Sequence, residues 1–332
     1  MITTTINDIN KLVAKVIASG KGISKDEALS LIQTPDLDAL CNAADRITKA
    51  FHSNQFDSCS IVNARSGMCG EDCKWCAQTT RHHTGCSTYN ILEEDKTLKA
   101  AHLNNQTGIR RFSLVTSGRS VSDSDLDKFL RIIRRLKEET DLHLCVSMGL
   151  LTESQLKRLK EAGIERYHCN METSERMWPS LVTTHTQSDK RKTIEAARRQ
   201  GMEICSGGII GMGETQEDRI DFAIMLRDME VDSVPMNILN PIKHTPLENT
   251  PLISEEEIIR CAAVWRFILP TQVIRFAGGR GRLSKANMKR LFQGGINGAI
   301  MGDMLTTIGN TLQEDFDLIA ASGLKIYPIT PP

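Results

Sequence analysis

Three cysteines lie close together in the stretch GMCGEDCKWCAQ, which spans residues 67–78. Cys69, Cys73 and Cys76 follow the spacing C-x3-C-x2-C, and no fourth cysteine or histidine follows at a comparable interval. Thiolates at such spacings bind zinc or iron–sulfur clusters. A structural zinc site is normally closed by four ligands, which argues against zinc. A 4Fe–4S cluster held by three cysteines leaves one iron free for a substrate or cofactor.

The chain around these cysteines alternates between short apolar runs and amphipathic, charged stretches. We expect strands at 58–64, 110–117, 142–149, 166–172, 203–211, 232–239, 271–278 and 297–302. Helical patterns of crossover length lie between most of them, which predicts an α/β fold of the (β/α)8 TIM-type barrel class. Because the cysteine triplet follows the first strand, it should lie at the C-terminal mouth of the barrel, where active sites of this fold lie.

The N-terminal residues follow a different pattern. NDINKLVAKVIASG has apolar residues at helical spacing and ends in glycine, and Ser24 suits the N-cap of a second helix. We therefore expect an N-terminal helical extension over 1–50, the barrel over 51–325 and a C-terminal tail over 326–332. The long first crossover, 77–109, begins with polar residues and predicts a functional loop.

Composition and charge exclude several classes of protein. The 332 residues include 41 Lys and Arg and 41 Asp and Glu, so the zero net charge does not suggest binding to nucleic acid. The first residues lack the apolar core of a signal peptide, and no stretch approaches the ~20 apolar residues of a membrane helix. We expect a cytoplasmic protein with no membrane association. In that reducing compartment, clustered cysteines indicate metal or redox chemistry.

The triplet, with Trp75 before its last cysteine, resembles the signature of the radical S-adenosylmethionine (SAM) enzymes. The motifs CKWCAQTTRHHTG, YHCNMETS, CSGGIIGMGET, SVPMNIL, HTPL and RFAGGRG, in this order, together resemble the biotin synthase family. The resemblance implies a 4Fe–4S cluster on the triplet, with SAM chelated at the open iron and cleaved to give a 5′-deoxyadenosyl radical. It implies a sulfurtransferase that converts dethiobiotin to biotin by inserting sulfur between C6 and C9.

The resemblance also implies roles for residues that bind SAM. The stretch GGIIGMGE has the family form G-x-I-x-G-x-x-E, which supports the adenine side of SAM. Asn170 and Glu172 lie two apart on the expected fourth strand, and therefore on one face. They match a ribose-binding pair whose second member is aspartate in the family, and Glu172 keeps the acceptor. An Asn–Glu pair that merely anchors a loop is the alternative. The G-x-I-x-G-x-x-E positions are Gly207, Ile209, Gly211 and Glu214.

Further residues are implied to contact the substrate. Asn237 matches an asparagine that contacts dethiobiotin. Asn170 is expected to contact dethiobiotin as well. Thr183 and Thr184 are candidates for the ureido or carboxylate end of dethiobiotin. Lys190 falls where the family often has an arginine near the active site, although a solvated lysine on a helix face is an alternative.

The family has a second cluster, usually 2Fe–2S, held by three cysteines and one arginine from barrel strands. Cys145, Cys205 and Arg275 match three of these positions, but the fourth is Ser113, and a serine oxygen is a poor substitute for thiolate on iron. Period-two alternation lets Cys59, in the first strand, face the same interior. We infer that Cys59 has exchanged roles with Ser113. This change of ligand geometry allows a larger second cluster, such as a 4Fe cluster with an extra sulfide.

Other interpretations remain open at this stage. Another radical SAM barrel, such as a hydrogenase-cofactor maturase, would share the triplet but would not need the cysteines and arginine of the second cluster. A non-catalytic metal-sensing protein would use the triplet alone. Cys86 is either a free loop thiol or a cluster contact. The resemblance further implies a homodimer and an electron-donor protein of the flavodoxin or ferredoxin type.

Overall fold

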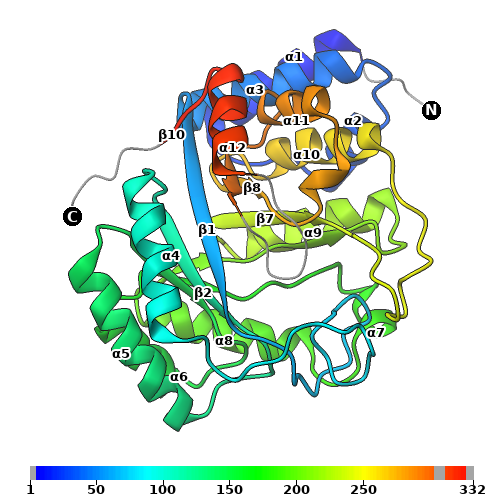
Figure 1. Ribbon diagram of the computed structural model, residues 1–332. Coiled ribbons are helices and arrows are strands. Elements are labelled where there is room, and N and C mark those ends of the chain that lie inside the picture. The colour runs from blue at the N-terminus through cyan, green and yellow to red at the C-terminus, as the bar shows by residue number, and fades with distance from the viewer. Residues whose placement is uncertain (1–4, 303–310, 327–332) are drawn as a thin grey trace.

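A closed barrel of parallel strands forms the centre of the computed structural model, which describes residues 5–302 and 311–326 (Figure 1). Its sheet runs in the order β1-β2-β3-β4-β5-β7-β8-β9, and β9 pairs back onto β1. The strands are β1 (Gln55–Arg65), β2 (Arg111–Thr116), β3 (His143–Ser147), β4 (Arg166–His168), β5 (Glu203–Cys205), β6 (Gly208–Ile210), β7 (Ser233–Ile238), β8 (Val273–Phe276) and β9 (Gly298–Ile300). The predicted barrel class is therefore confirmed.

Amphipathic helices cover the outside of the barrel. In α5 (Asp123–Glu139), the buried side chains recur at helical spacing and form one stripe against the strands, while Ser122 caps the first turn. The other helices after β1 are α4 (Glu94–Gln106), α6 (Glu153–Glu161), α7 (Trp178–Leu181), α8 (Gln187–Arg199), α9 (Gln216–Asp228), α10 (Glu255–Ile268), α11 (Lys285–Phe292) and α12 (Leu312–Ala321), with a 3-10 turn η1 (Arg280–Arg282).

Three helices precede the barrel, as the sequence predicts. They are α1 (Ile6–Ser19), α2 (Lys25–Leu31) and α3 (Leu37–His52). Ser24 caps α2 through a capping box with Glu27. In Figure 1 this group lies at the top, beside α10 and α11, whereas the segment after β1 that carries the triplet lies at the opposite end. A short strand, β10 (Lys325–Ile326), pairs with the start of β1. Residues 327–332 of the expected tail lie outside the described residues.

Two of the eight expected strands differ from the prediction. The fourth ends at His168, so Asn170 and Glu172 lie beyond it, and Glu172 has a left-handed φ of 69°. The fifth is divided into β5 and β6. Pro235 of β7 lies opposite the break and has no N–H to continue the ladder, which explains the interruption.

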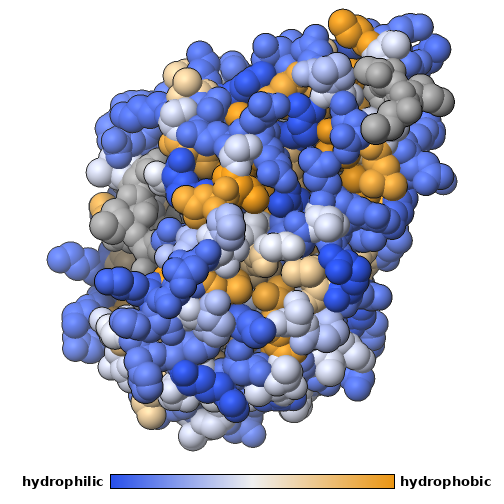
Figure 2. All heavy atoms as spheres, turned by 90° about the vertical axis from the view of Figure 1, so that its right-hand side faces the viewer, coloured by the Kyte–Doolittle hydropathy of each residue, from blue (hydrophilic) through white to orange (hydrophobic). Residues whose placement is uncertain are grey.

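The surface shows no single large apolar area on the face drawn in Figure 2, where hydrophobic side chains form small patches among polar ones. Within the described ranges, no helix is long and apolar enough to cross a membrane. Most large hydrophobic side chains instead pack between the barrel and its helices, for example Phe56 of β1 and Phe292 of α11, whose ring centroids lie 5.0 Å apart.

Gly207 lies at the break between β5 and β6, where its backbone closely approaches that of Pro235 in β7. A Cβ atom there would lie 2.1 Å from the carbonyl oxygen of Pro235, so Gly207→Ala should displace one strand from the other. We expect a loss of about 1–3 kcal/mol in the free energy of unfolding, measured by urea denaturation. Gly281→Ala is the matched control, because a Cβ there meets nothing within 4 Å. Equal stability of the two variants would contradict the close approach.

Candidate functional site

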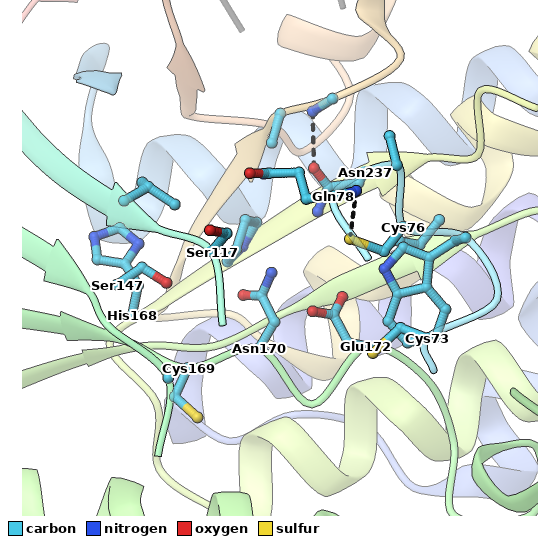
Figure 3. A pocket seen from close by; sticks show the side chains of 18 of the residues that line it. Cys73, Cys76, Gln78, Ser117, Ser147, His168, Cys169, Asn170, Glu172 and Asn237 are labelled. Carbon is cyan, nitrogen blue, oxygen red and sulfur yellow. Dashed lines mark hydrogen bonds between the residues drawn. The ribbon is translucent and has the colours of Figure 1, made fainter. Parts of the chain in front are cut away.

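A cavity of about 440 Å³ opens where the barrel strands end at their carboxyl side (Figure 3). This volume lies in the range of cavities that hold cofactors and small substrates. The cavity is lined by side chains from the triplet loop, from the strand ends and from the barrel interior. The sequence-predicted residues among them are Cys69, Cys73, Trp75, Cys76, Asn170, Glu172, Lys190, Cys205, Ile209, Asn237 and Arg275.

Backbone hydrogen bonds fix the loop that carries the cysteine triplet. The N–H of Cys69 donates to the carbonyl of Gln78 over 3.2 Å, and the N–H of Cys76 donates to the carbonyl of Cys73 over 3.0 Å. The N–H of Gln78 donates to the Sγ of Cys76 over 3.4 Å (Figure 3). Burial raises the pKa of the Cys76 thiol to about 11 and raises that of Cys73 further. These thiols must therefore lose a proton when they bind iron.

Two carboxylates between the first two cysteines hold the loop to the segment after α7. The Thr184 hydroxyl donates to Glu71 over 2.6 Å, and His185 Nδ1 lies 2.5 Å from the same carboxylate. The backbone N–H and the hydroxyl of Thr183 both donate to Asp72. Neither threonine lines the cavity, and both hydroxyls are engaged by the loop. The structure thus gives no support to their expected contact with the substrate, and they position the triplet loop instead.

Asn170, Glu172 and Lys190 form a polar group on one wall of the cavity. Figure 3 shows the side chains of Asn170 and Glu172 pointing to the same side. Lys190 Nζ donates to the carbonyl of Asn170 over 2.8 Å and lies 5.5 Å from the ring of Trp178. Burial raises the pKa of Glu172, and Lys190 opposes that shift. Lys190 is therefore a cavity residue, and the alternative of a fully solvated lysine is wrong.

The G-x-I-x-G-x-x-E segment shapes the cavity mainly through its backbone. The carboxylate of Glu214 accepts the N–H groups of Gly211 over 2.6 Å and of Met212 over 2.7 Å, so it holds the turn without lining the cavity. The N–H of Gly207 donates to the side-chain oxygen of Asn170 over 3.2 Å. Ile209 is the member of the motif whose side chain reaches the cavity.

Asn237 joins two strand ends at the edge of the cavity. Its Nδ2 donates to the carbonyl of Gly208 over 3.0 Å, and its Oδ1 accepts the N–H of Gly278 over 2.8 Å. A ligand that bonds to this side chain must share or replace those bonds. The side chain nevertheless lines the cavity, where the family resemblance expects it.

Below the mouth, the four residues expected at the second cluster meet inside the barrel. Cys59, Cys145, Cys205 and Arg275 each expose 1% of their surface or less. Burial raises the pKa of Cys59 to about 12, Arg275 lowers it, and the other two thiols raise it, so the other three groups all lie within electrostatic reach of Cys59. This proximity is what an exchange of roles between Cys59 and Ser113 requires.

The barrel interior at this level is polar. Bulky apolar residues usually fill a barrel of this size. Here Ser113 Oγ, His168 Nε2 and Arg275 Nε are buried, and none of them has a hydrogen-bond partner among the residues that the structure describes. Unpaired buried polar atoms are costly and need a partner. The thiols, hydroxyl and imidazole therefore fit a polar, metal-containing group. In the described ranges, no three His, Cys, Asp or Glu side chains converge on one point where a single ion could bind.

A network of buried charges closes the barrel beneath the thiols. Asp57 Oδ1 lies 3.1 Å from Arg275 Nη2, and Asp57 Oδ2 lies 3.2 Å from Arg111 Nε. Glu203, an exposed carboxylate at the edge of this network, lies 2.7 Å from Arg166 and 3.4 Å from Arg111. Although burial opposes ionisation, Arg275 and Arg111 hold the pKa of Asp57 well below its usual range. Burial likewise opposes the charge on Arg275, but Asp57 and Cys59 raise its pKa.

Sequence reasoning did not single out several residues that the structure places here. Glu71 and Gln78 support the triplet loop, and Asp57 and Arg166 belong to the buried charge network. His168 lines the cavity between the mouth and the thiols. The sequence held one signal for some of these residues, because alternate residues of a strand share a face. Asp57 lies two positions before Cys59, Arg166 lies two before His168, and His168 lies two before Asn170.

Comparison with known families gives two matches along the chain. Residues 65–226 match the radical SAM superfamily, and residues 235–325 match the Biotin and Thiamin Synthesis associated domain. The biotin synthase of Parabacteroides distasonis is 46% identical over 310 residues, which cover 93% of this chain and 95% of that protein. The biotin synthase of Porphyromonas gingivalis is 48% identical over 301 residues, which cover 91% of each chain.

Solved structures with a similar fold are more distant in sequence. A crystal structure of methylornithine synthase superimposes with a TM-score of 0.83 at 17% identity and covers 96% of this chain and 98% of that one. HydG, a maturase of the FeFe-hydrogenase, gives a TM-score of 0.79 at 15% identity. The match covers 97% of this chain and 76% of that one. At these identities the likeness concerns the barrel fold alone.

The charge network makes a prediction for Asp57→Asn. The substitution leaves Arg275 buried without its carboxylate partner and leaves Arg111 paired with Glu203 alone. We therefore expect a loss of about 3–5 kcal/mol in the free energy of unfolding at neutral pH. Because the pKa of Asp57 is lowered on folding, its ionisation stabilises the fold above the unfolded-state pKa of about 4. That stabilisation is lost as the pH falls through the folded-state pKa, so the difference between the proteins should shrink below pH ~4.

Urea denaturation over a series of pH values measures this difference. The control is Asp45→Asn, which removes a solvent-exposed pair with Lys49 and should cost less than about 1 kcal/mol. A difference between wild type and Asp57→Asn that is as small as in the control, or independent of pH in acid, would disprove the role of Asp57.

Proposed function

The chain belongs to the biotin synthase family, and we propose on this basis how its residues divide the conversion of dethiobiotin to biotin. The enzyme inserts sulfur into dethiobiotin with SAM as the radical source and an iron–sulfur cluster in the barrel as the sulfur source. The observation that carries the division of roles is a single cavity whose lining includes both the triplet thiols and Cys205 and Arg275 of the barrel interior.

Cys69, Cys73 and Cys76 are proposed to hold the cluster that binds SAM. When bound, the two clusters and SAM supply the hydrogen-abstracting radical and the sulfur atom. The protein fixes the triplet loop in advance through the bonds of Glu71 and Asp72. Such preorganisation places reacting groups at short range and so lowers the entropic part of the barrier.

The walls near the triplet are proposed to bind SAM. Trp75 and Ile209 lie in one apolar cluster with Met212 and Trp178, and this cluster offers a surface for the adenine ring. Asn170 and Glu172 supply acceptors for the ribose hydroxyls. Lys190 supplies a positive charge beside them, which suits a carboxylate. Gly207, Gly211 and Glu214 set the backbone on which this surface lies.

Dethiobiotin is proposed to lie between SAM and the barrel interior, with Asn237 and Asn170 as polar contacts. The side chains of Ile61, Val115 and Ile300 line the same cavity. An apolar, water-poor environment protects a carbon radical from quenching and strengthens the few polar contacts that orient the substrate. Thr183 and Thr184 act on the substrate only through the loop that they hold.

The sulfur-donating cluster is proposed to lie among Cys59, Cys145, Cys205 and Arg275. In the family, the residue at the position of Ser113 is a cysteine that binds the cluster. In this chain, Cys59 is proposed to bind the cluster in its place. Because this moves one thiolate to a neighbouring strand, a four-iron cluster with an additional sulfide fits the ligand set as an alternative to 2Fe–2S. The unpartnered Oγ of Ser113, judged within the described residues, supports a group in contact with this wall.

Several properties of the assembly rest on the family resemblance alone. We propose a cytoplasmic homodimer that receives electrons from a protein of the flavodoxin or ferredoxin type. Oxygen-sensitive clusters and free cysteines suit a reducing compartment.

No observation favours the two rival functions. The likeness to HydG is one of fold, at 15% identity, whereas the biotin synthases are 46–48% identical over more than nine-tenths of the chain. A metal sensor would have no use for a polar group of thiols deep in the barrel. Fold alone does not decide between activities, but the residues of the site do.

Cys73→Ala tests the assignment of the triplet. Without this ligand the cluster is lost or detached from its place beside SAM, so formation of 5′-deoxyadenosine should fall to background in anaerobic assays with dithionite. Cys86→Ala is the control, because this half-buried thiol lies near Cys76 but outside the triplet. We expect Cys86→Ala to retain cleavage of SAM. Undiminished 5′-deoxyadenosine from Cys73→Ala would refute the assignment.

Cys59→Ser and Ser113→Ala form a matched pair for the second cluster. Cys59→Ser should remove the iron and sulfide of that cluster, abolish biotin formation and spare SAM cleavage, since a hydroxyl is a poor ligand for iron. Ser113→Ala should leave iron, sulfide and biotin formation largely unchanged. Chemical analysis with Mössbauer spectroscopy reports both clusters. The exchange of roles fails if Cys59→Ser keeps its full iron content or if Ser113→Ala loses the second cluster.

A further inference from the structure

His168 occupies a central place among the thiols of the barrel. It ends β4, the strand between β3 and β5, and its Cα pairs with that of Cys205 in β5. Two positions earlier on the same strand, Arg166 pairs with Cys145 of β3. Neighbouring strands lie about 4.8 Å apart and alternate residues share a face. The imidazole therefore enters the interior between two of the three cysteines.

The environment of the imidazole leaves one nitrogen without a partner. The residue is half-buried because it lines the cavity, where Figure 3 shows its ring beside Ser147, but its Nε2 atom is itself buried. Its side chain interacts with Cys145. Nε2 has no hydrogen-bond partner within the part of the chain that the structure describes. An unsatisfied buried nitrogen costs about 1–3 kcal/mol, so a group that bonds to Nε2 would stabilise this geometry.

The other nitrogen donor of the site, Arg275, is already engaged. Its Nη2 lies 3.1 Å from Asp57 Oδ1 and 3.5 Å from Ser233 Oγ, and its Nη1 lies 3.4 Å from the carbonyl of Asp57 and 3.5 Å from that of Ala299. Both terminal nitrogens therefore already have oxygen partners, and a guanidinium group offers hydrogen-bond donors and no acceptor. Its remaining free group, Nε, can only donate a hydrogen bond.

We propose that Nε2 of His168 is the fourth protein ligand of the second cluster, beside Cys59, Cys145 and Cys205. Arg275 then contacts the cluster as a charged hydrogen-bond donor and not as a ligand. Neutral imidazole binds iron through its unprotonated nitrogen, and histidine replaces cysteine in some iron–sulfur centres. This inference rests on the proposed function, because it requires a second cluster in the barrel.

Isotope labelling of the full-length, cluster-loaded protein tests the ligand directly. The enzyme is produced with 15N-labelled histidine, its clusters are reduced, and nitrogen hyperfine couplings are measured by pulsed electron paramagnetic resonance. A bound imidazole nitrogen should convert from a 14N to a 15N coupling on labelling. The triplet cluster has no histidine ligand, so its couplings, including any from SAM, should not respond. This measurement needs no substitution and does not depend on the folding of a variant.

Variants then assign the nitrogen to one histidine. The histidine coupling should be lost in His168→Asn and persist in His143→Asn, a control histidine on the adjacent β3 that binds Glu165. His168→Cys should restore iron and sulfide to the wild-type content while the nitrogen coupling stays absent. A purely structural role for His168 would not be rescued by a thiolate in this way.

Three outcomes would overturn the proposal. The first is a second cluster, with biotin formed, whose spectrum does not respond to labelled histidine. The second is a nitrogen coupling that disappears in Arg275→Lys but survives in His168→Asn. In both cases the proposed function stands and only the ligand assignment falls. The third is wild-type protein that forms neither a second cluster nor biotin, which would overturn the proposed function together with this inference.

Discussion

The ion pairs of Asp57 with Arg275 and Arg111 are the interaction on which the barrel interior depends. Buried charges are tolerated only when they are paired and hydrogen-bonded, and here one carboxylate on β1 bridges two guanidinium groups. Arg111 lies on the adjacent β2, and Arg275 lies on β8, on the far side of β9. The bridge closes the bottom of the barrel without filling its middle with apolar side chains. It thereby leaves room for thiols, a hydroxyl and an imidazole at the level above, and it holds a positive charge next to them.

Above these ion pairs, the kind of side chain that lines the barrel interior changes from one level to the next, in an order that suits radical sulfur insertion. The thiols and His168 lie above the charges, the apolar side chains of Ile61, Val115 and Ile300 help to line the cavity, and the triplet loop closes its mouth. In the proposed division of roles, the lowest level would hold the sulfur source, the middle level would exclude water and the uppermost level would position SAM. The levels share one cavity, so the substrate can meet both reactive groups without leaving it.

The comparisons separate what the fold contributes from what the site contributes. The same barrel, superimposing with a TM-score of about 0.8, occurs in methylornithine synthase and in HydG at 15–17% identity. The scaffold therefore does not choose the reaction. The inward positions of the strands can make that choice, and Cys59, Ser113 and His168 are the inward residues to which the proposed sulfur-donating site assigns its distinguishing features.

The sequence alone determined the barrel class and the cysteine triplet, because strand periodicity and ligand spacing are local properties of the chain. It also placed the eight strands, apart from the end of the fourth and the division of the fifth. It also indicated Cys59, since alternation along β1 is local too. Only the tertiary structure decided what depends on partners distant in sequence. Asp57 meets Arg275 across 218 positions, and Thr184 binds Glu71 across 113. Pro235 interrupts the fifth strand from the opposite side. The sequence places His168 on the same strand face as Asn170, but a single histidine has no ligand spacing of its own. Its importance depends on the cysteines that the neighbouring strands bring beside it.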